Sequence, residues 1–226
     1  MEPFNTKIKA IIFDMDGTII KTEDAWRQVN LELLAHYGFT EFSPEQQVVL
    51  DSFHGMAALM TVVTRLKEHF NIDDPVEVII AKKIEIANRK LADHVEFVEG
   101  FKEFHNKLAQ LAIPTSIATN AVPENLAGLA QRLDFEKFFG SNMYCAAHVG
   151  NRPKPDPALF LHAAQMLGVK PEECLVFEDS AYGFQAAQAA GMKCIAIKTS
   201  YNEHLLDQVN GAILTYHEAE EAIKKL

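Results

Sequence analysis

The chain has 226 residues, of which 48% are hydrophobic and 23% charged, and its formal net charge is −10. This composition is sufficient for a packed core and excludes a disordered chain, while the negative charge argues against a general nucleic-acid-binding protein. No apolar run approaches the roughly 20 residues that a membrane span needs, and residues 1–10 lack the apolar region of a secretory signal, so we expect a cytoplasmic protein with no membrane partner.

The first predicted element is a buried strand at residues 7–14, because a short continuous apolar run with β-branched residues ends in a glycine turn. A series of helices follows, in the segments 22–39, 55–70 and 75–94. Thr22 is the predicted N-cap of the first helix, and Gly38 lies where its end is expected. From Thr22 to His94 the sequence predicts helices and no strand.

Beyond residue 94 strands and helices alternate. The predicted strands are 115–119, 143–148, 173–179 and 193–197. The predicted helices are 99–112, 123–133, 155–168, 180–191 and 217–226, and in the first of them Phe101, Phe104, Leu108 and Leu111 share one face. This alternation indicates an α/β fold with a doubly wound parallel (Rossmann-like) sheet. We expect residues 1–21 and 95–226 to form this core domain, with residues 22–94 inserted as a helical domain.

Polar residues gather where the predicted strands end. In doubly wound sheets the ligand site lies beyond the carboxyl ends of the strands. The residues that follow strands there are Asp14, Asp16, Thr119, Asn120, Lys154, Glu178 and Asp179. Each one alone is most simply a polar loop residue, but their joint placement favours a single site.

The spacing of the carboxylates suggests their chemistry. Asp14 and Asp16 face the same way, because side chains alternate along an extended strand. Asp179 adds a third negative charge, and such a cluster of oxygens suits Mg²⁺. One carboxylate can then act as a nucleophile that accepts a phosphoryl group, and the other as a general acid and base. Lys154 and the Thr119 hydroxyl can neutralise and orient the phosphoryl oxygens.

These residues resemble the haloacid dehalogenase superfamily of phosphotransferases. The stretch "DMDGT" from Asp14 resembles its first motif, D-x-D-G-[TV], and Thr119 in "SIATN" resembles the second. Lys154 in "RPKPDPALFL" resembles the third motif, and "VFEDSAYGF" resembles the fourth, E-D-[SA]-x-x-G. All four occur in the family's order. The segment 22–94 lies where the capped subclass I, which includes the β-phosphoglucomutase-like group, places a helical cap domain.

The resemblance implies roles for individual residues. Asp14 would be the nucleophile and Asp16 the general acid and base. The transferring phosphate would be held by Thr119, Lys154 and the backbone N–H groups of Met15 and Asn120. The implied cofactor, Mg²⁺, would be bound by the Asp14 carboxylate, the Asp16 backbone carbonyl and Asp179, with Glu178 either a further ligand or a residue that supports one.

The resemblance also distinguishes activities. Asp16 indicates cleavage of a P–O ester, since the family's true dehalogenases and phosphonate-cleaving members lack this residue. We expect a Mg²⁺-dependent phosphatase acting on a small phosphorylated metabolite, a sugar phosphate or a similar compound. The alternative is a sugar-phosphate mutase of the β-phosphoglucomutase type. Such mutases carry a histidine where this chain has Trp26, and polar or basic residues where it has Val122 and Pro123.

Two classes outside the enzymes remain as alternatives. A receiver-type signalling domain also combines acids, a threonine and a lysine, but its acid pair is adjacent in sequence. A non-catalytic phosphate-binding protein on the same scaffold is disfavoured, because Asp14 and Asp16 are both present. We expect a monomer or a weak homodimer.

Two further expectations concern the remaining residues. Trp26, Phe53 and Met56 are expected mainly in the packed interior of the helical insertion, whereas residues 50–56 are a candidate specificity loop that faces the site. The three cysteines are far apart and are expected to be buried free thiols.

Overall fold

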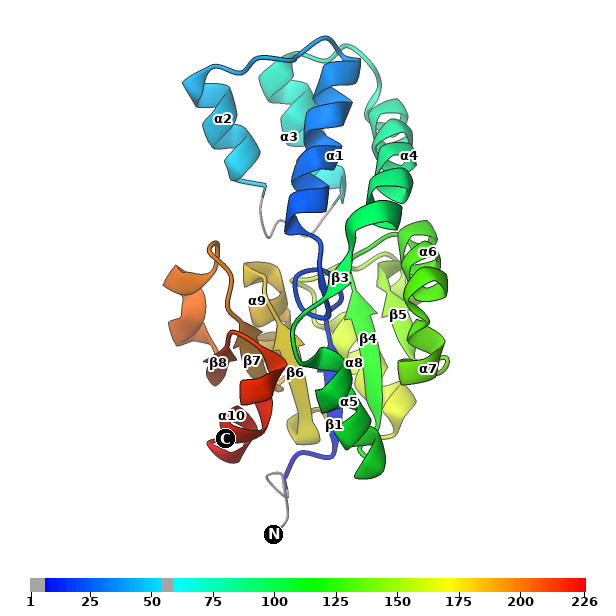
Figure 1. Ribbon diagram of the computed structural model, residues 1–226, viewed down its shortest axis with the longest axis vertical. Coiled ribbons are helices and arrows are strands. Elements are labelled where there is room, and N and C mark those ends of the chain that lie inside the picture. The colour runs from blue at the N-terminus through cyan, green and yellow to red at the C-terminus, as the bar shows by residue number, and fades with distance from the viewer. Residues whose placement is uncertain (1–6, 54–58) are drawn as a thin grey trace.

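The computed structural model describes residues 7–53 and 59–226. Its centre is a six-stranded parallel sheet in the order β5-β4-β1-β6-β7-β8 (Figure 1). The strands are β1 (Ala10–Phe13), β4 (Thr115–Thr119), β5 (Met143–Cys145), β6 (Cys174–Glu178), β7 (Lys193–Ile197) and β8 (Gly211–Ile213). The predicted α/β class with a doubly wound parallel sheet is therefore confirmed.

Helices cover both faces of this sheet. They are α5 (Phe101–Gln110), α6 (Pro123–Leu133), α7 (Phe135–Phe139), α8 (Ala158–Leu167), α9 (Ala181–Ala189) and α10 (Ala219–Lys224). In β1, Ile11 and Phe13 join an apolar cluster that includes residues of α5, α7 and α10, whereas Ala10 and Ile12 join a second cluster with α8 and α9. A strand buried on both faces explains why its sequence is a continuous apolar run.

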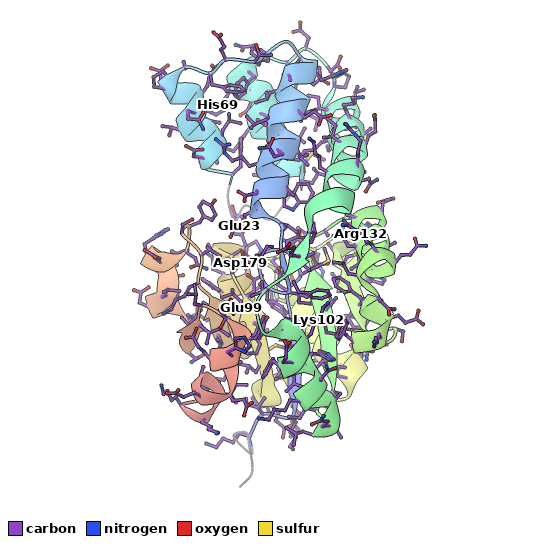
Figure 2. The ribbon with its side chains drawn as sticks, in the orientation of Figure 1. Glu23, His69, Glu99, Lys102, Arg132 and Asp179 are labelled. Carbon is purple, nitrogen blue, oxygen red and sulfur yellow. The ribbon has the colours of Figure 1, made fainter. Side chains whose placement is uncertain are left out.

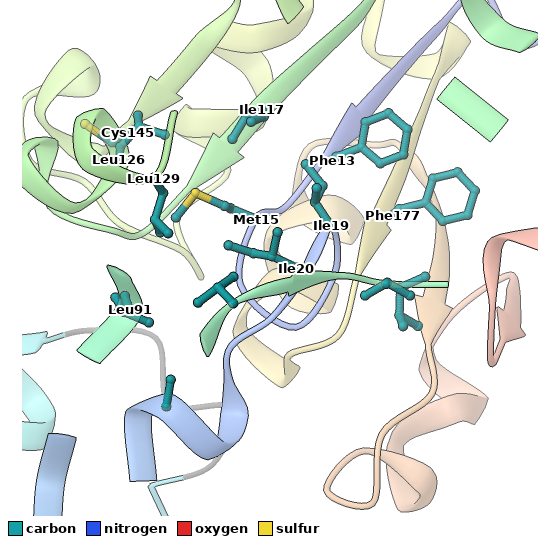
Figure 3. Packing of buried hydrophobic residues seen from close by; sticks show 14 of the residues in the cluster. Phe13, Met15, Ile19, Ile20, Leu91, Ile117, Leu126, Leu129, Cys145 and Phe177 are labelled. Carbon is teal, nitrogen blue, oxygen red and sulfur yellow. The ribbon is translucent and has the colours of Figure 1, made fainter. Parts of the chain in front are cut away.

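The first face is rich in aromatic rings. Phe13 stacks on Phe177 of the neighbouring strand, with their ring centroids 5.4 Å apart, and both rings lie in the buried apolar layer on this face (Figure 3). Phe101 and Phe104 of α5 meet Phe13 edge to face. This packing fixes the end of β1, from which the chain continues directly into Asp14.

The helical insertion lies at the carboxyl ends of the strands, apart from the sheet (Figure 1). Its helices are α1 (Glu23–His36), α2 (Pro44–Asp51), α3 (Leu59–Phe70) and α4 (Val76–His94). We call this segment the cap. Arg132 of α6 donates a hydrogen bond to the Leu91 carbonyl of α4, which ties the cap to the core.

A short ribbon joins the cap to the core. Strand β2 (Ile20–Lys21) pairs antiparallel with β3 (Glu96–Phe97), with Ile20 opposite Phe97 and Lys21 opposite Glu96. The sequence did not predict this ribbon. It brings the two chain crossings between cap and core side by side.

Several predicted elements differ from the observed ones. The segment 143–148 is a strand only as far as Cys145, and then a 3₁₀ turn at Ala146–Val149. Leu111 is 38% exposed, because α5 ends at Gln110 and turns this side chain away from the buried face. Helices α2 and α7 and strand β8 were not predicted. Residues 54–58, where the predicted helix 55–70 begins, lie outside the described part of the chain.

Other features agree with expectation. Cys145, Cys174 and Cys194 are buried and free. Gly168 ends α8 with a positive φ of 69°, which glycine adopts without steric cost. Within residues 7–53 and 59–226, no helix combines the length and apolar character needed to cross a membrane.

Candidate active site

A pocket of about 170 Å³ lies between the carboxyl ends of the strands and the cap. Its core wall contains all seven polar residues expected from the strand ends: Asp14, Asp16, Thr119, Asn120, Lys154, Glu178 and Asp179. The fold therefore gathers residues from four separate segments, as the sequence predicted. Asp179 lies at the junction of cap and core, on the side of Glu23 at the start of α1 (Figure 2).

Lys154 is the electrostatic centre of this wall. Its side chain is 1% exposed, and its Nζ donates hydrogen bonds to Asp14 Oδ1 at 2.5 Å and Glu178 Oε1 at 2.8 Å. Burial alone lowers the pKa of Lys154, but the two carboxylates outweigh that effect and raise it above its ordinary value. The ammonium therefore stays charged at neutral pH.

The pKa values of the neighbouring carboxyl groups are also raised, which for an acid favours the neutral form. Burial raises the pKa of Asp14 well above its ordinary value, and Lys154 offsets only part of this rise. Burial likewise raises the pKa of Asp179, and the negative charges of Glu178 and Asp14 raise it further. One lysine does not neutralise this cluster of acids. A further cation bound here would therefore be stabilised by the remaining negative charge.

Glu178 is fully engaged by the protein. While Oε1 accepts from Lys154, Oε2 accepts from the backbone N–H groups of Asp179 at 2.7 Å and Ser180 at 2.6 Å. Gly183 makes this position possible, because a Cβ at residue 183 would lie 1.8 Å from the Glu178 carboxyl carbon. Because both oxygens of Glu178 are bonded within the protein, this geometry favours the expected supporting role over direct metal binding.

Asp16 points toward the cap. Its Oδ1 accepts a hydrogen bond from Trp26 Nε1 at 3.0 Å. Burial raises the pKa of Asp16, and the hydrogen bonds from Trp26 and Thr22 lower it in part. Trp26 therefore contacts a predicted catalytic group, which differs from the expectation of a purely packed residue. Thr22 occupies the N-cap position as predicted but makes no capping hydrogen bond, since its hydroxyl serves Asp16 instead.

Thr119 and Asn120 follow β4. The Thr119 hydroxyl accepts the Ala121 N–H at 3.1 Å, which leaves its proton available to a ligand in the pocket. The Asn120 side chain accepts the Lys154 N–H at 2.9 Å and donates to the Lys154 carbonyl at 3.2 Å. Asn120 thus fixes the main chain that carries the lysine. The Met15 side chain lies in the apolar layer, so only its backbone can face a phosphate (Figure 3).

The donor set fits Mg²⁺ only when backbone oxygen is included. Within the described ranges, no three His, Cys, Asp or Glu side chains are grouped to hold a metal ion by themselves. However, a Cβ on Gly17 would lie 2.1 Å from Asp179 Oδ2, so the main chain after Asp16 closely approaches this carboxylate. Two carboxylates, of Asp14 and Asp179, and the Asp16 carbonyl match an ion that keeps several waters.

Sequence reasoning missed two residues that hold Asp179. Thr18 Oγ1 donates to Asp179 Oδ1 at 3.3 Å, and Asn202 Nδ2 donates to the Asp179 carbonyl at 2.7 Å and the Ile197 carbonyl at 2.8 Å. Thr18 belongs to the "DMDGT" stretch, so its match to the first family motif could have marked it as a site residue. Asn202 lies in a loop after β7, where no local pattern marks it.

The cap wall of the pocket carries different side chains from the core wall. It includes apolar side chains, among them Leu50 and Phe53, and the polar residues Arg27, Asn30 and Lys83. Leu50 and Phe53 support the expected specificity loop at 50–56, and Phe53 is both buried and in the pocket lining. The remainder of that loop, including Met56, lies outside the described residues.

Comparisons with known proteins place this geometry in a family. Residues 11–197 match the family described as haloacid dehalogenase-like hydrolase. The chain is 31% identical over 191 residues to the fructose-1-phosphate phosphatase YqaB of Escherichia coli, covering 83% of this chain and 95% of that protein. It is 29% identical over 190 residues to a phosphorylated carbohydrates phosphatase of Thermotoga maritima, covering 83% and 84% of the two chains.

A solved structure gives the same result for the fold. A putative beta-phosphoglucomutase from Thermotoga maritima superposes with a TM-score of 0.76 at 25% identity, covering 97% of this chain and 100% of that one. The family match spans both halves of the core and the cap between them, and it includes every strand that carries a pocket residue. The chain therefore belongs to the haloacid dehalogenase-like hydrolase family.

Proposed function

We propose that this protein is a Mg²⁺-dependent phosphatase that hydrolyses a small phosphate monoester through an aspartyl-phosphate on Asp14. The observation that carries this proposal is the buried contact between Lys154 Nζ and Asp14 Oδ1, at 2.5 Å, on the wall of a small pocket. A buried ammonium beside a carboxylate nucleophile can balance the charge of an incoming phosphoryl group.

Different residues of the chain carry out the separate steps of the reaction. The Asp14 carboxylate attacks phosphorus, while Lys154 and the Thr119 hydroxyl stabilise the phosphoryl oxygens. Asp16, whose raised pKa favours the protonated form, gives its proton to the leaving alkoxide. The same carboxylate then takes a proton from the water that hydrolyses the acyl phosphate. Trp26 holds the Asp16 carboxylate on the cap side of the pocket.

A magnesium ion would be held by the Asp14 carboxylate, the Asp16 carbonyl and Asp179. When bound, Mg²⁺ would neutralise this acidic cluster and the transferring phosphate together. Glu178 and Thr18 would position the lysine and Asp179 around it.

The cap, residues 22–94, would close over the pocket and exclude bulk water from the acyl phosphate. Because Trp26 and Thr22 contact Asp16 from the cap side, its docking also orients the general acid. We propose residues 1–21 and 95–226 as the catalytic domain and the cap as a separate domain.

The substrate class is a sugar phosphate or a similar metabolite. A pocket of about 170 Å³ suits a small leaving group, and two relatives are named as phosphatases of fructose 1-phosphate and of phosphorylated carbohydrates. A mutase of the β-phosphoglucomutase type is the second candidate, supported by structural likeness. The indole of Trp26 and the apolar Val122 on the pocket wall favour water over a sugar phosphate as the acceptor.

Phosphate release from a panel of sugar phosphates, nucleotides and phosphoglycolate tests the proposal. With Mg²⁺, wild-type protein should release phosphate, Asp14→Asn should not, and exhaustive chelation should stop turnover. Asp16→Asn should be nearly inactive and accumulate a phosphorylated chain, detectable by intact mass. Wild-type rates in the Asp14 variant would refute the nucleophile. With β-glucose 1-phosphate, formation of an isomer instead of inorganic phosphate would establish the mutase.

A further inference from the structure

The cap wall of the pocket carries two cations without an acidic partner. Lys83 on α4 and Arg27 on α1 both line the pocket. Neither forms an ion pair with any residue in the ranges 7–53 and 59–226, although other lysines and arginines of the cap do, such as Lys82 with Glu85 and Arg89 with Glu32. These two basic side chains therefore lie on the pocket wall without an ion-pair partner in those ranges.

Lys83 is the more unusual of the two. It is 4% exposed, its Nζ donates to Asn30 Oδ1, and the ammonium lies 5.7 Å from the centroid of the Trp26 ring. Burial lowers the pKa of Lys83 to about 7, and no carboxylate offsets this. A buried amine of this kind is only partly charged near neutral pH, and an anion bound beside it would favour the ammonium form.

Asn125 supplies an independent observation. Its side chain is on the pocket wall, the residue is 5% exposed, and Oδ1 accepts no hydrogen bond from the described chain. A buried acceptor of this kind requires a donor, which a hydroxyl group of a ligand can supply.

The pocket is thus polarised along its length. At the core end lie Asp14, Asp16, Glu178 and Asp179 with one lysine. At the cap end lie Lys83 and Arg27, and Glu23 at the start of α1 is the one acid of the cap among the described lining residues. A ligand that places its scissile phosphate at the core end presents its leaving group to the cations of the cap.

We propose that Lys83 and Arg27 form a subsite for a second anionic group on the leaving-group side of the substrate, with Asn125 accepting one of its hydroxyls. The substrate is then a phosphate ester of a hydroxylated carbon chain that ends in a carboxylate or a second phosphate. This inference rests on the proposed function, because it assigns the leaving group of the same reaction.

Matched substrate pairs test the subsite. Gluconate 6-phosphate and glucose 6-phosphate differ by a terminal carboxylate, and fructose 1,6-bisphosphate and fructose 1-phosphate by a second phosphate. In at least one pair the wild-type kcat/KM should be about tenfold or more higher for the acidic member. The pair that shows the preference distinguishes a carboxylate from a phosphate. p-Nitrophenyl phosphate, which has no second acid, measures the basal chemistry.

Variants connect the preference to the residues. Lys83→Met should lower kcat/KM for the preferred acidic substrate by about 30-fold, mainly through KM, because an anion then meets an uncharged wall. The loss on the neutral partner should be smaller, so that the ratio of kcat/KM between acidic and neutral members falls in the variant. Lys83→Arg should retain part of the preference. Lys82→Met is the matched control, since Lys82 pairs with Glu85 and is not in the pocket lining, and it should change nothing.

A stability measurement separates a binding role from a structural one. Lys83→Met removes a buried charge without a partner, so its thermal midpoint should rise while its binding weakens. A falling midpoint together with an unchanged substrate preference would assign Lys83 to the fold alone and overturn the subsite.

The proposed function and the subsite fail in different ways. Turnover of p-nitrophenyl phosphate with no acidic preference in either pair would overturn the subsite and leave the phosphatase intact. Absence of any turnover would count against the phosphatase. The subsite is then tested by binding alone, with the fluorescence of Trp26, the single tryptophan. Equal dissociation constants for acidic and neutral members would overturn it, and a difference that Lys83→Met abolishes would support it.

Discussion

Asp16, the proposed general acid, contacts Trp26 of the cap. The indole N–H donates to Asp16 Oδ1 at 3.0 Å, and the Thr22 side chain also lowers the pKa of this carboxyl group. A carboxylate that must both give and take a proton needs a fixed position, since proton transfer depends on hydrogen-bond geometry. Trp26 supplies that position from an element that is not part of the sheet.

We expect Trp26→Phe to lower kcat by about tenfold, because losing the hydrogen bond that orients the Asp16 carboxyl group costs about 1.4 kcal/mol. Trp26→His keeps a ring N–H and should lose less. Steady-state rates with p-nitrophenyl phosphate measure both variants. Equal losses in the two variants would show that the indole acts by shape and not as a donor.

Gly183 is the residue on which the position of Glu178 depends. We expect Gly183→Ala to destabilise the fold by about 1–3 kcal/mol and to reduce kcat, because its Cβ would displace the carboxylate that holds Lys154. Urea denaturation and steady-state rates measure the two effects.

Gly128→Ala is the matched control for this substitution. Gly128 lies inside α6, and a Cβ there meets nothing within 4 Å. The control should stabilise the fold by about 0.5–1 kcal/mol and leave kcat unchanged. If both variants behaved alike, the contact with Glu178 would not be the cause.

At the scale of elements, the sequence predicts long periodic segments well and short ones poorly. Every strand that carries a pocket residue was predicted, because buried parallel strands are continuous apolar runs. The ribbon β2–β3, with two residues in each strand, has too few positions to show a period. Helix α2 carried a signal that was overlooked, since Ser43 and Gln46 form a capping box directly before and within it.

The same distinction applies to the site. Residues at strand ends were predictable, because topology alone brings them together, and all seven do line the pocket. Trp26 and Lys83 were not predicted as pocket groups, because their place depends on how the cap docks on the core. Asn202 was missed for a similar reason, since its loop meets Asp179 only in the folded molecule.

Helix α5 contains a titratable group that links stability to pH. His105 is buried, its Nε2 lies 2.9 Å from Thr115 Oγ1, and burial lowers its pKa to about 4. The unfolded chain takes up this proton near pH 6.5. Protonation therefore favours the unfolded state as the pH falls from about 6.5 to about 4, and this contribution to stability is fully present above that window.

We expect the free energy of unfolding to fall by about 2 kcal/mol between pH 7 and pH 5 on account of His105. His105→Gln, which can still bond to Thr115, should lack this component. Urea denaturation of both proteins at the two pH values measures the difference, so that changes due to other groups cancel. Identical pH dependence in the two proteins would contradict the assignment.

At the scale of the whole molecule, a chain of net charge −10 gathers several of its acids at one end of the sheet. Burial raises the pKa values of both Asp14 and Asp179, and the negative charge of Glu178 raises both further, so the folded protein gathers acids here that it does not neutralise alone. Binding of a cation together with phosphate should therefore stabilise the fold, because the unfolded chain has no such site.

We expect saturating Mg²⁺ with inorganic phosphate to raise the thermal midpoint by about 5–10 °C, as ligand at about 100 times its dissociation constant stabilises a chain of this size. Asp179→Asn should lose most of this shift. Asp73→Asn, at an exposed position of the cap, should keep it. A full shift in the Asp179 variant would place the ion elsewhere.

The ribbon β2–β3 has a consequence for engineering. Lys21 and Glu96 are paired neighbours, so the two ends of the intervening segment already meet. A foreign segment whose ends are equally close could be grafted there at little cost in loop closure, whatever its length. The protein thus offers a cassette position, at which exchange of residues 22–94 would give new selectivity to the strand-end residues of the core, if the new segment also supplies a donor to Asp16 as Trp26 does.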